Sequence, residues 1–220
     1  ALMRLRKMDR SDFALKYESS MLSLDTLTLH QKEKLRDIEE GRGRHVHVRA
    51  PAGAGKTFIA LHYILGELQK SYGAGAGGGG NGGYVLFVAR NRPLAFFVAR
   101  WIWARIENEA PSKKCHVWEH LHILTAPADD NGDDGTNGRG SGGGVPLIPY
   151  VVSEDTENNR IVFKPHKIFP YDLVVIDEAH HVYRDAALAD LLENMYMQNF
   201  EGRRVVLSDM SQALTGKIKY

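Results

Sequence analysis

The sequence predicts an α/β fold in which a parallel β-sheet is flanked by helices. Short apolar runs have the length of buried strands, and segments with apolar residues at helical spacing alternate with them. Strand followed by helix, repeated along the chain, favours parallel strands joined by helical crossovers. The expected strands cover residues 45–49, 84–89, 120–125, 173–176 and 205–207.

Helices are expected where apolar residues recur every three or four positions. One such pattern covers residues 58–68 and another covers residues 94–106, which contain Trp101 and Trp103. These two rings are of the kind that stacks on nucleic-acid bases, but Trp101 falls on the apolar helix face, which favours the core. A β-hairpin is expected over residues 150–164, where two β-prone runs flank a polar segment.

Composition limits the classes of protein to which the chain can belong. Its 220 residues, 43% of them hydrophobic, are enough for one domain with a substantial core. Lys and Arg number 28 against 27 Asp and Glu, so the overall charge does not favour nucleic acid, although local basic patches stay open. Cys115 is the single cysteine and can form no internal disulfide, so an intracellular location, cytoplasmic or nuclear, is expected. No apolar run approaches the roughly 20 residues that span a bilayer, and no membrane partner is expected.

Two stretches, residues 73–83 and 132–144, hold most of the 22 glycines. Segments of small and polar residues bury too little apolar surface to offset the entropy of ordering, so both are expected to be loop insertions. Phosphate binding is the alternative, but no Lys-Ser or Lys-Thr pair follows either stretch. The expected organisation is an N-terminal extension over 1–26 and one domain over 27–220. The start at Ala1 and the end soon after a motif suggest a piece of a longer protein.

Residues 50–57 read Ala-Pro-Ala-Gly-Ala-Gly-Lys-Thr, the Walker A pattern with alanine at its first glycine position. A strand is expected before this segment and an amphipathic helix after it, which is the context the pattern requires. Gly53 and Gly55 can turn successive N–H groups towards phosphate oxygens, beside the positive end of the helix dipole. Lys56 would reach the β- and γ-phosphates of ATP, and Thr57 would ligate Mg²⁺. The loop residues predicted to bind the nucleotide are Pro51, Ala52, Gly53, Ala54, Gly55, Lys56 and Thr57.

Residues 173–180 read Leu-Val-Val-Ile-Asp-Glu-Ala-His, a buried strand that ends in two carboxylates, as a Walker B segment does. Ligands of open α/β sheets bind outside the carboxyl ends of the strands, which would place Asp177 beside the glycine loop. Asp177 is predicted to hold Mg²⁺, directly or through water, and Glu178 to orient or deprotonate the attacking water. A glycine-rich turn with a chance lysine and a strand end with solvated acids are the alternatives. The presence of both motifs argues against them and predicts a P-loop NTPase.

His180 and His181 follow the acidic pair directly. Together with Asp177 and Glu178 they suggest a metal site, but zinc is not expected because no further cluster of ligands has zinc-site spacing. His180 is expected instead to couple the nucleotide site to a neighbouring surface through a hydrogen bond. His181 is expected to be an exposed residue of the next helix.

Over residues 27–212 the order of motifs resembles the first RecA-like domain of superfamily one helicases and related helicase-like ATPases, with the two glycine-rich stretches as insertions. Residues 27–31, Leu-Thr-Leu-His-Gln, resemble the Q motif of that family. The resemblance implies that Gln31 reads the adenine edge, for which an amide that both donates and accepts is suited. A surface glutamine at the start of a charged helix is the alternative.

Two further segments resemble family motifs. The segment from Val85 to Leu94 resembles motif Ia, which implies that Arg90, Asn91 and Arg92 contact the backbone of a nucleic-acid strand, although a solvated loop explains them equally well. Residues 205–212, Val-Val-Leu-Ser-Asp-Met-Ser-Gln, resemble motif III, which implies that Gln212 senses the γ-phosphate and that Asp209 relays the signal. The chain departs from the family at Ser208, where motif III has glycine, and at His180, where glutamine is usual.

The resemblance implies ATP binding and hydrolysis by a motor that moves single-stranded DNA or RNA. In the family a second RecA-like domain supplies arginines that complete the ATP site, so this domain alone is expected to bind ATP and turn it over slowly. The alternative function is a signalling or regulatory ATPase that uses the same site as a switch and moves no strand, which the near-zero charge favours. A module that binds nucleotide without hydrolysing it conflicts with the presence of Lys56, Asp177 and Glu178.

Overall fold

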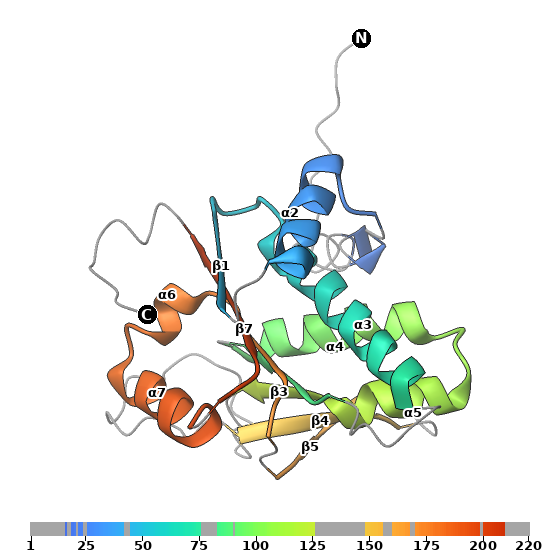
Figure 1. Ribbon diagram of the computed structural model, residues 1–220. Helices are drawn as coiled ribbons and strands as arrows, with labels where there is room; N and C mark the ends of the chain where they lie inside the picture. Colours follow the sequence, from blue (N-terminus) through green and yellow to red (C-terminus); the bar gives the residue numbers. More distant parts are fainter. Residues whose placement is uncertain are drawn as a thin grey trace, which may run out of the picture.

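Within its described residues, the protein has three layers, with a mostly parallel seven-stranded sheet between two layers of helices (Figure 1). The computed structural model describes residues 16, 19–20, 22–23, 26–41, 45–75, 83–89, 91–125, 148–155, 160–167, 170–198 and 200–209. The strands are β1 (His45–Ala50), β2 (Val85–Val88), β3 (Leu121–Thr125), β4 (Ile148–Asp155), β5 (Arg160–Pro165), β6 (Leu173–Ile176) and β7 (Arg203–Asp209). The helices are α2 (Leu29–Glu40), α3 (Lys56–Gly75), α4 (Arg92–Ile106), α5 (Pro111–His120), α6 (Ala179–Val182), α7 (Ala186–Leu191) and the π-helical turn η1 (Leu192–Tyr196).

The strand order in the sheet is β1-β7-β6-β2-β3-β4-β5. The first five of these strands are parallel, which confirms the expected α/β class with helices on the sheet. The predicted hairpin is confirmed as β4 and β5, but it does not stand apart from the sheet. Its first strand pairs antiparallel with β3 and thereby extends the parallel sheet at one edge.

Alternation of side chains along the strands divides the core into two parts. Val85 and Phe87 of β2 face a cluster formed with α3, α4 and α5, whereas Leu86 and Val88 face a second cluster formed with α6 and η1. Successive side chains of a strand point to opposite faces, so a strand that is apolar throughout requires cover on both sides. Trp101 of α4 is fully buried in the first cluster, which confirms that it is a core residue.

Two element boundaries differ from the sequence prediction. Residues 73–75 belong to α3, although they open the first glycine-rich stretch, and the rest of that loop, 76–82, lies outside the described residues. Packing explains the longer helix, because Tyr72 and Ser71 in its last turns hydrogen-bond to Ser112 and His116 of α5 at 2.9 Å. Tertiary contacts of this kind override the low helix propensity of glycine. The second stretch, 132–144, lies outside the described residues.

The sequence predicts no helix over residues 111–120 and a strand from residue 120, whereas the structure has the helix α5 there and β3 begins at Leu121. Pro111 occupies the first turn of α5, where proline is tolerated, and His120 ends the helix with its Nδ1 2.8 Å from the carbonyl oxygen of His116. The strand therefore begins at Leu121. Among the described residues, no helix combines the length and the hydropathy that crossing a membrane requires.

Leu27, at the predicted boundary, is the first buried residue of the described chain, although the partly buried Leu22 before it packs against the same core. Leu27 is buried, and Thr28 caps α2 directly after it. On the other side of this boundary, the carbonyl oxygen of Leu22 accepts a hydrogen bond from Arg105 of α4 at 3.1 Å. The division into an extension over 1–26 and a domain over 27–220 stays a prediction.

Candidate functional site

The two motif segments meet at one edge of the sheet. Strands β1, β7 and β6 are parallel neighbours, so their carboxyl ends lie side by side. β1 leads into the loop of residues 51–55, here called the glycine loop, and β6 leads into Asp177 and Glu178. β7 lies between them and ends at Asp209, which is opposite Ala50 and only 4% exposed. The sequence places these segments more than 120 positions apart, and the strand order brings them together.

The glycine loop has the backbone geometry that its glycines make possible. Gly53 has φ of 76° and Gly55 has φ of 84°, values at which any other residue would be strained. Lys56, the first residue of α3, is 7% exposed, and its ammonium donates to the carbonyl oxygens of Ala50 at 2.9 Å and Pro51 at 3.0 Å. The loop thus curves over the start of α3 with a buried cation held against it. Anionic groups are stabilised at such a helix N-terminus.

Gln31 joins α2 to this loop. Its Oε1 accepts from the backbone N–H of Thr28 at 2.9 Å, in a capping box at the start of α2. Its Nε2 donates to the carbonyl oxygen of Ala54 at 3.2 Å, close enough to Gly55 that a Cβ there would lie 2.2 Å from the same nitrogen. Gln31 is therefore beside the predicted nucleotide loop, as the Q-motif resemblance implies, and its contact with adenine stays a prediction.

Thr57 and Asp177 are in direct contact. The Thr57 hydroxyl donates to Asp177 Oδ2 at 2.7 Å, and the other carboxylate oxygen, Oδ1, accepts from the backbone N–H of Glu178 at 2.8 Å. Asp177 is 1% exposed, and this burial raises the pKa of its carboxyl, against the lowering effect of the bond from Thr57. Two oxygen donors beside one another in a buried setting form a donor set that suits a hard cation such as Mg²⁺.

Glu178 has a left-handed backbone, and its side chain lies beside two histidines. Its φ of 50° and ψ of 40° lie in the left-handed region, and it is the only non-glycine residue with positive φ in the described chain. Its carboxylate oxygen Oε2 lies 3.3 Å from Nε2 of His180 and 4.0 Å from Nε2 of His181. The acidic pair is therefore divided. One carboxylate bonds to Thr57, and the other lies beside two imidazoles on the first turn of α6.

The structure corrects the expectation for the two histidines. His180 is fully buried, so its contact is with Glu178 rather than with a neighbouring surface, because α6 packs its first turn against the sheet. The His181 side chain is 27% exposed and also lies near Glu178, so it is more than an exposed residue of the next helix. Zinc was not expected for lack of clustered ligands. Within the described residues, however, the ligand atoms of Glu178, His180 and His181 all lie within 4.8 Å of one another.

A polar pair that the sequence did not reveal joins β1 to β7 beside the site. His47 Nε2 and Ser208 Oγ are 2.6 Å apart, and Arg49 Nε donates to His47 Nδ1 at 3.1 Å. Burial, followed by the charge of Arg49, lowers the pKa of His47. Ser208 is fully buried at the position where the family's motif III has glycine. The signal that marks Ser208 in the sequence is its place directly after the apolar run 205–207 of β7.

Other predicted contacts are only partly described. Arg90 and Gln212 lie outside the described residues. Asn91 caps α4, its Oδ1 accepting from the Leu94 N–H at 2.9 Å, and the Arg92 guanidinium lies 5.4 Å from the ring centre of Phe96. These contacts explain both residues structurally, and their contact with a nucleic-acid strand stays a prediction.

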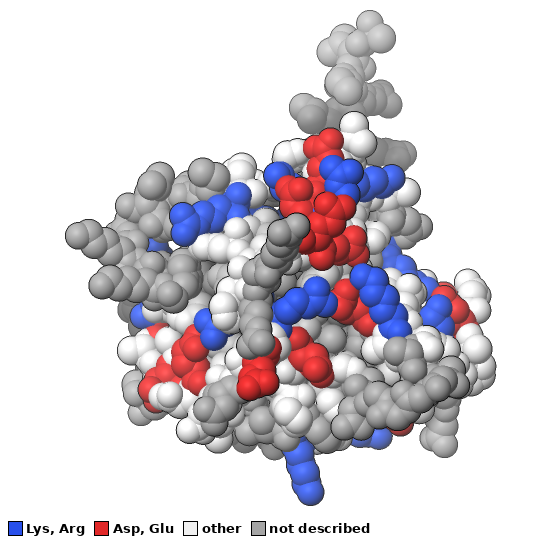
Figure 2. Space-filling model, in the orientation of Figure 1, with Lys and Arg blue, Asp and Glu red and all other residues white. Residues whose placement is uncertain are grey.

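The charges on the described surface are mixed. Figure 2 shows Lys and Arg side chains interspersed with Asp and Glu side chains over the face in view. Among the described residues, Lys34 pairs with Asp37 and Lys70 pairs with Glu67, both at 2.9 Å. Such neighbours reduce the field that a polyanion would meet.

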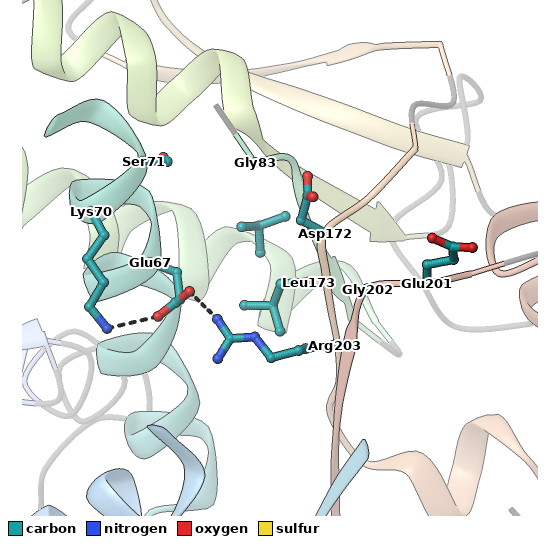
Figure 3. Close-up of a pocket in the computed structure, with 10 residues that line it drawn as sticks. Glu67, Lys70, Ser71, Gly83, Asp172, Leu173, Glu201, Gly202 and Arg203 are labelled. Atoms are coloured by element: carbon teal, nitrogen blue, oxygen red, sulfur yellow. Dashed lines mark hydrogen bonds and ion pairs between the residues drawn. The ribbon is translucent and has the colours of Figure 1, made fainter. Parts of the chain in front are cut away.

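A pocket of about 490 Å³ lies at the opposite edge of the sheet, at the amino ends of β2, β6 and β7 (Figure 3). Glu67 lies between Lys70 and Arg203 and pairs with both. Asp172 accepts from the Tyr84 N–H at 3.0 Å and therefore helps to fix the start of β2. The pocket is far along the sheet from the glycine loop, and three of its charged groups, Glu67, Lys70 and Arg203, are paired with one another. It does not include any residue predicted to bind a nucleotide.

Comparison with known proteins identified no relative. No protein-family model, no curated protein and no solved structure matches the chain.

Proposed function

We propose that the chain is a P-loop ATPase domain, the first RecA-like domain of a superfamily one helicase-like protein, which binds ATP with Mg²⁺ and hydrolyses it. One observation carries this proposal. The hydrogen bond between Thr57 and Asp177 joins the Lys-Thr end of the glycine loop to the acidic pair, 120 positions away, at the carboxyl edge of parallel strands. Ligands of open α/β sheets bind at this edge.

The triphosphate would bind against the glycine loop and the start of α3. Gly53 and Gly55 supply the backbone angles that direct N–H groups towards phosphate oxygens, and the helix N-terminus adds its positive end. Lys56 would exchange its two carbonyl acceptors for the β- and γ-phosphates. Such bonds between ionised partners are stronger than the bonds to carbonyl oxygens that they replace.

The donor set at Thr57 and Asp177 fits Mg²⁺. Neighbouring ligands of an octahedral magnesium ion with bonds of 2.0–2.1 Å lie about 2.9 Å apart, close to the 2.7 Å between these two oxygens. When bound, the ion would neutralise charge on the phosphate oxygens. The burial that raises the pKa of Asp177 in the protein alone would then be offset by the charge of the cation.

Glu178 would act on the attacking water. The Asp177 carboxylate accepts the hydrogen bond from Thr57 and the partly exposed Glu178 carboxylate does not, which leaves one carboxylate for the cation and one for the water. In this step Glu178 accepts a proton from water, the water oxygen forms a bond to the γ-phosphorus, and the bond from that phosphorus to the β-bridging oxygen breaks to release ADP. Asp209, at the end of the intervening strand, is placed between the two segments, where it would relay the state of the γ-phosphate.

A signalling or regulatory switch is the second candidate. The even mixture of acidic and basic side chains on the visible face, and the near balance of 28 basic and 27 acidic residues, favour a function without a bound nucleic-acid strand. In the motor a second RecA-like domain would supply the arginines that speed phosphoryl transfer, so turnover by this domain alone is expected to be slow.

Nucleotide binding and hydrolysis by two variants test the site. We expect Lys56→Ala to weaken Mg²⁺-ATP binding by at least about 10-fold, because it removes a charge-assisted bond. Glu178→Gln should keep binding and slow hydrolysis by about 100-fold or more. Lys70→Ala, which changes a lysine at the opposite end of α3, is the matched control and should change neither quantity. Unaltered ATP affinity in Lys56→Ala would contradict the site assignment.

The motor and the switch are separated by the effect of nucleic acid. A protein that carries this domain together with a second RecA-like domain should hydrolyse ATP faster when single-stranded DNA or RNA is added, if it is a motor. The same rate with and without either strand would favour the switch.

A further inference from the structure

A cluster of three metal-binding side chains lies beside the proposed ATP site. Glu178, His180 and His181, here called the Glu-His-His cluster, come from the turn after β6 and the first residues of α6. In the described part of the chain, this is the one group of three or more such side chains with mutually close ligand atoms. The Mg²⁺ donors proposed above, Thr57 and Asp177, are not part of it.

The distances within the cluster match those of a shared metal ion. Tetrahedral ligands with metal bonds of 2.0–2.1 Å are about 3.4 Å apart. Glu178 Oε2 is 3.3 Å from His180 Nε2 and 4.0 Å from His181 Nε2, and no pair of ligand atoms exceeds 4.8 Å. Small side-chain rotations of the partly exposed Glu178 and His181 would bring all three atoms to one centre.

The burial of His180 is an independent sign of a ligand. Its side chain is fully buried, and neither ring nitrogen makes a hydrogen bond within the described residues. Nε2 is within ion-pair distance of Glu178, but outside hydrogen-bond geometry. A buried polar group without a hydrogen bond is unfavourable, and coordination through Nε2 would remove part of that penalty.

We propose that the Glu-His-His cluster binds a divalent transition metal ion of the Zn²⁺ class. Two imidazoles and one carboxylate are ligands that zinc accepts, whereas Mg²⁺ prefers oxygen ligands alone. Glu178 is 41% exposed and His181 is 27% exposed, so the fourth position of the ion opens towards solvent and takes water. The site therefore differs in chemistry from the neighbouring oxygen pair, Thr57 and Asp177.

Metal binding here would inhibit ATP turnover, a consequence that rests on the proposed function. Glu178 cannot accept a proton from water while its carboxylate is bound to the ion. Lys56, Thr57 and Asp177 stay available, so nucleotide binding is retained. Zinc would therefore act as an inhibitor of hydrolysis that leaves the affinity for Mg²⁺-ATP unchanged.

Titration of the metal-free protein with Zn²⁺ or Co²⁺, in the absence of nucleotide, tests the site directly. We expect one equivalent to bind, with the intense visible absorption of tetrahedral Co²⁺. Substitution of a residue that only supports a metal ligand reduces metal affinity about 10- to 100-fold. Because His181 would itself be a ligand, His181→Ala should weaken binding by at least about 10-fold. His180→Gln should do the same, and thermal unfolding would check that the buried substitution leaves the protein folded.

His45→Ala is the matched control, because His45 is an exposed histidine at the amino end of β1. It should leave the affinity for Zn²⁺ unchanged. Retention of full Zn²⁺ affinity by His181→Ala, or the absence of stoichiometric binding by the unaltered protein, would overturn the proposal. Since His181 is partly exposed, this variant tests the cluster even if His180→Gln does not fold.

ATP turnover separates this inference from the proposed function. Zn²⁺ should inhibit turnover of the unaltered protein, and the concentration for half inhibition should rise at least about 10-fold in His181→Ala. Stoichiometric Zn²⁺ binding without any ATP binding or turnover would support the metal site and contradict the proposed function. ATP turnover that zinc does not inhibit, together with no Co²⁺ absorption, would contradict only the metal site.

Discussion

The two edges of the parallel sheet hold charged groups in different ways. At the carboxyl edge, Lys56 and Asp177 are buried and the backbone takes left-handed angles at Gly53, Gly55 and Glu178. At the amino edge, charged residues such as Glu67 and Arg203 are partly exposed and pair with one another. Strained backbone and buried charge reduce stability unless a ligand offsets them, and they cluster at functional sites. The contrast therefore favours the carboxyl edge as the binding site, although the described pocket lies at the other edge.

The largest effect that we predict at the amino edge is a loss of stability in acid. Burial, and then the charge of His166, lowers the pKa of His122 to about 4 from 6.5, and Tyr171 lies 3.0 Å from its Nδ1. The centre of the Tyr84 ring lies 5.7 Å from that of His122, and Tyr84 also stacks on His120 at 4.9 Å. The unfolded chain binds this proton below pH 6.5 and the folded protein does not. The free energy of unfolding should therefore fall by up to about 3 kcal/mol between pH 6.5 and 4.

His122→Gln should remove most of this dependence, since the amide can still bond to Tyr171 but does not titrate in that range. Denaturant unfolding at several pH values would measure the difference between the two proteins. The same acid loss in both would show that another group is responsible. A pH dependence caused by His122 would show that the amino edge also holds a buried group that reduces stability in acid, and it would weaken the contrast between the edges.

Two glycines, Gly55 directly before Lys56 and Gly66 within α3, test the strain at the carboxyl edge. Gly55→Ala should lower the free energy of unfolding by about 1–2 kcal/mol, because φ of 84° is unfavourable for alanine. Its Cβ would also displace Gln31 Nε2, and ATP binding should weaken. Gly66→Ala, within α3 and with no atom within 4 Å of the added Cβ, should raise stability by about 0.5–1 kcal/mol. Denaturant unfolding would measure both, and equal effects would contradict the assigned strain.

Substitution of Asp177 tests whether this buried carboxylate reduces the stability of the protein alone and increases it when Mg²⁺-ATP is bound. Burial raises the pKa of Asp177, so the stability that this group contributes is fully present below pH 3.8 and is lost as pH rises through its raised pKa in the folded protein. Asp177→Asn should therefore raise the free energy of unfolding at neutral pH, and the gain should shrink in acid. It should also abolish the stabilisation by Mg²⁺-ATP. Thermal unfolding with and without nucleotide measures both effects. An Asp177→Asn protein that is less stable than the unaltered protein without nucleotide would contradict the prediction.

The smallest effect is expected from the ion pairs of the amino edge. Glu67→Gln breaks the pairs with Lys70 and Arg203, whose side chains are 61% and 40% exposed. Pairs of this exposure contribute less than about 1 kcal/mol, so unfolding should change little and ATP binding not at all. Loss of ATP binding in Glu67→Gln would show that the pocket takes part in nucleotide recognition.

Much of the fold was predictable because buried strands and amphipathic helices repeat at different periods. The apolar run 173–176 gave the bounds of β6, and the alternation of strands with helices gave the parallel α/β class. The sequence does not predict the boundaries that packing decides. Residues 73–75 are helical because α5 packs beside them, and no local pattern marks that contact.

The sequence by itself determined which residues are suited to a phosphate and a cation, because glycine permits positive φ and because Lys, Thr and Asp carry the required groups. Only the tertiary structure decided which groups meet. The place of β7 between β1 and β6 brings Thr57 to Asp177, and the left-handed turn at Glu178 directs its carboxylate towards His180 and His181. Side-chain chemistry is local, whereas strand order and backbone angles arise from contacts between distant segments.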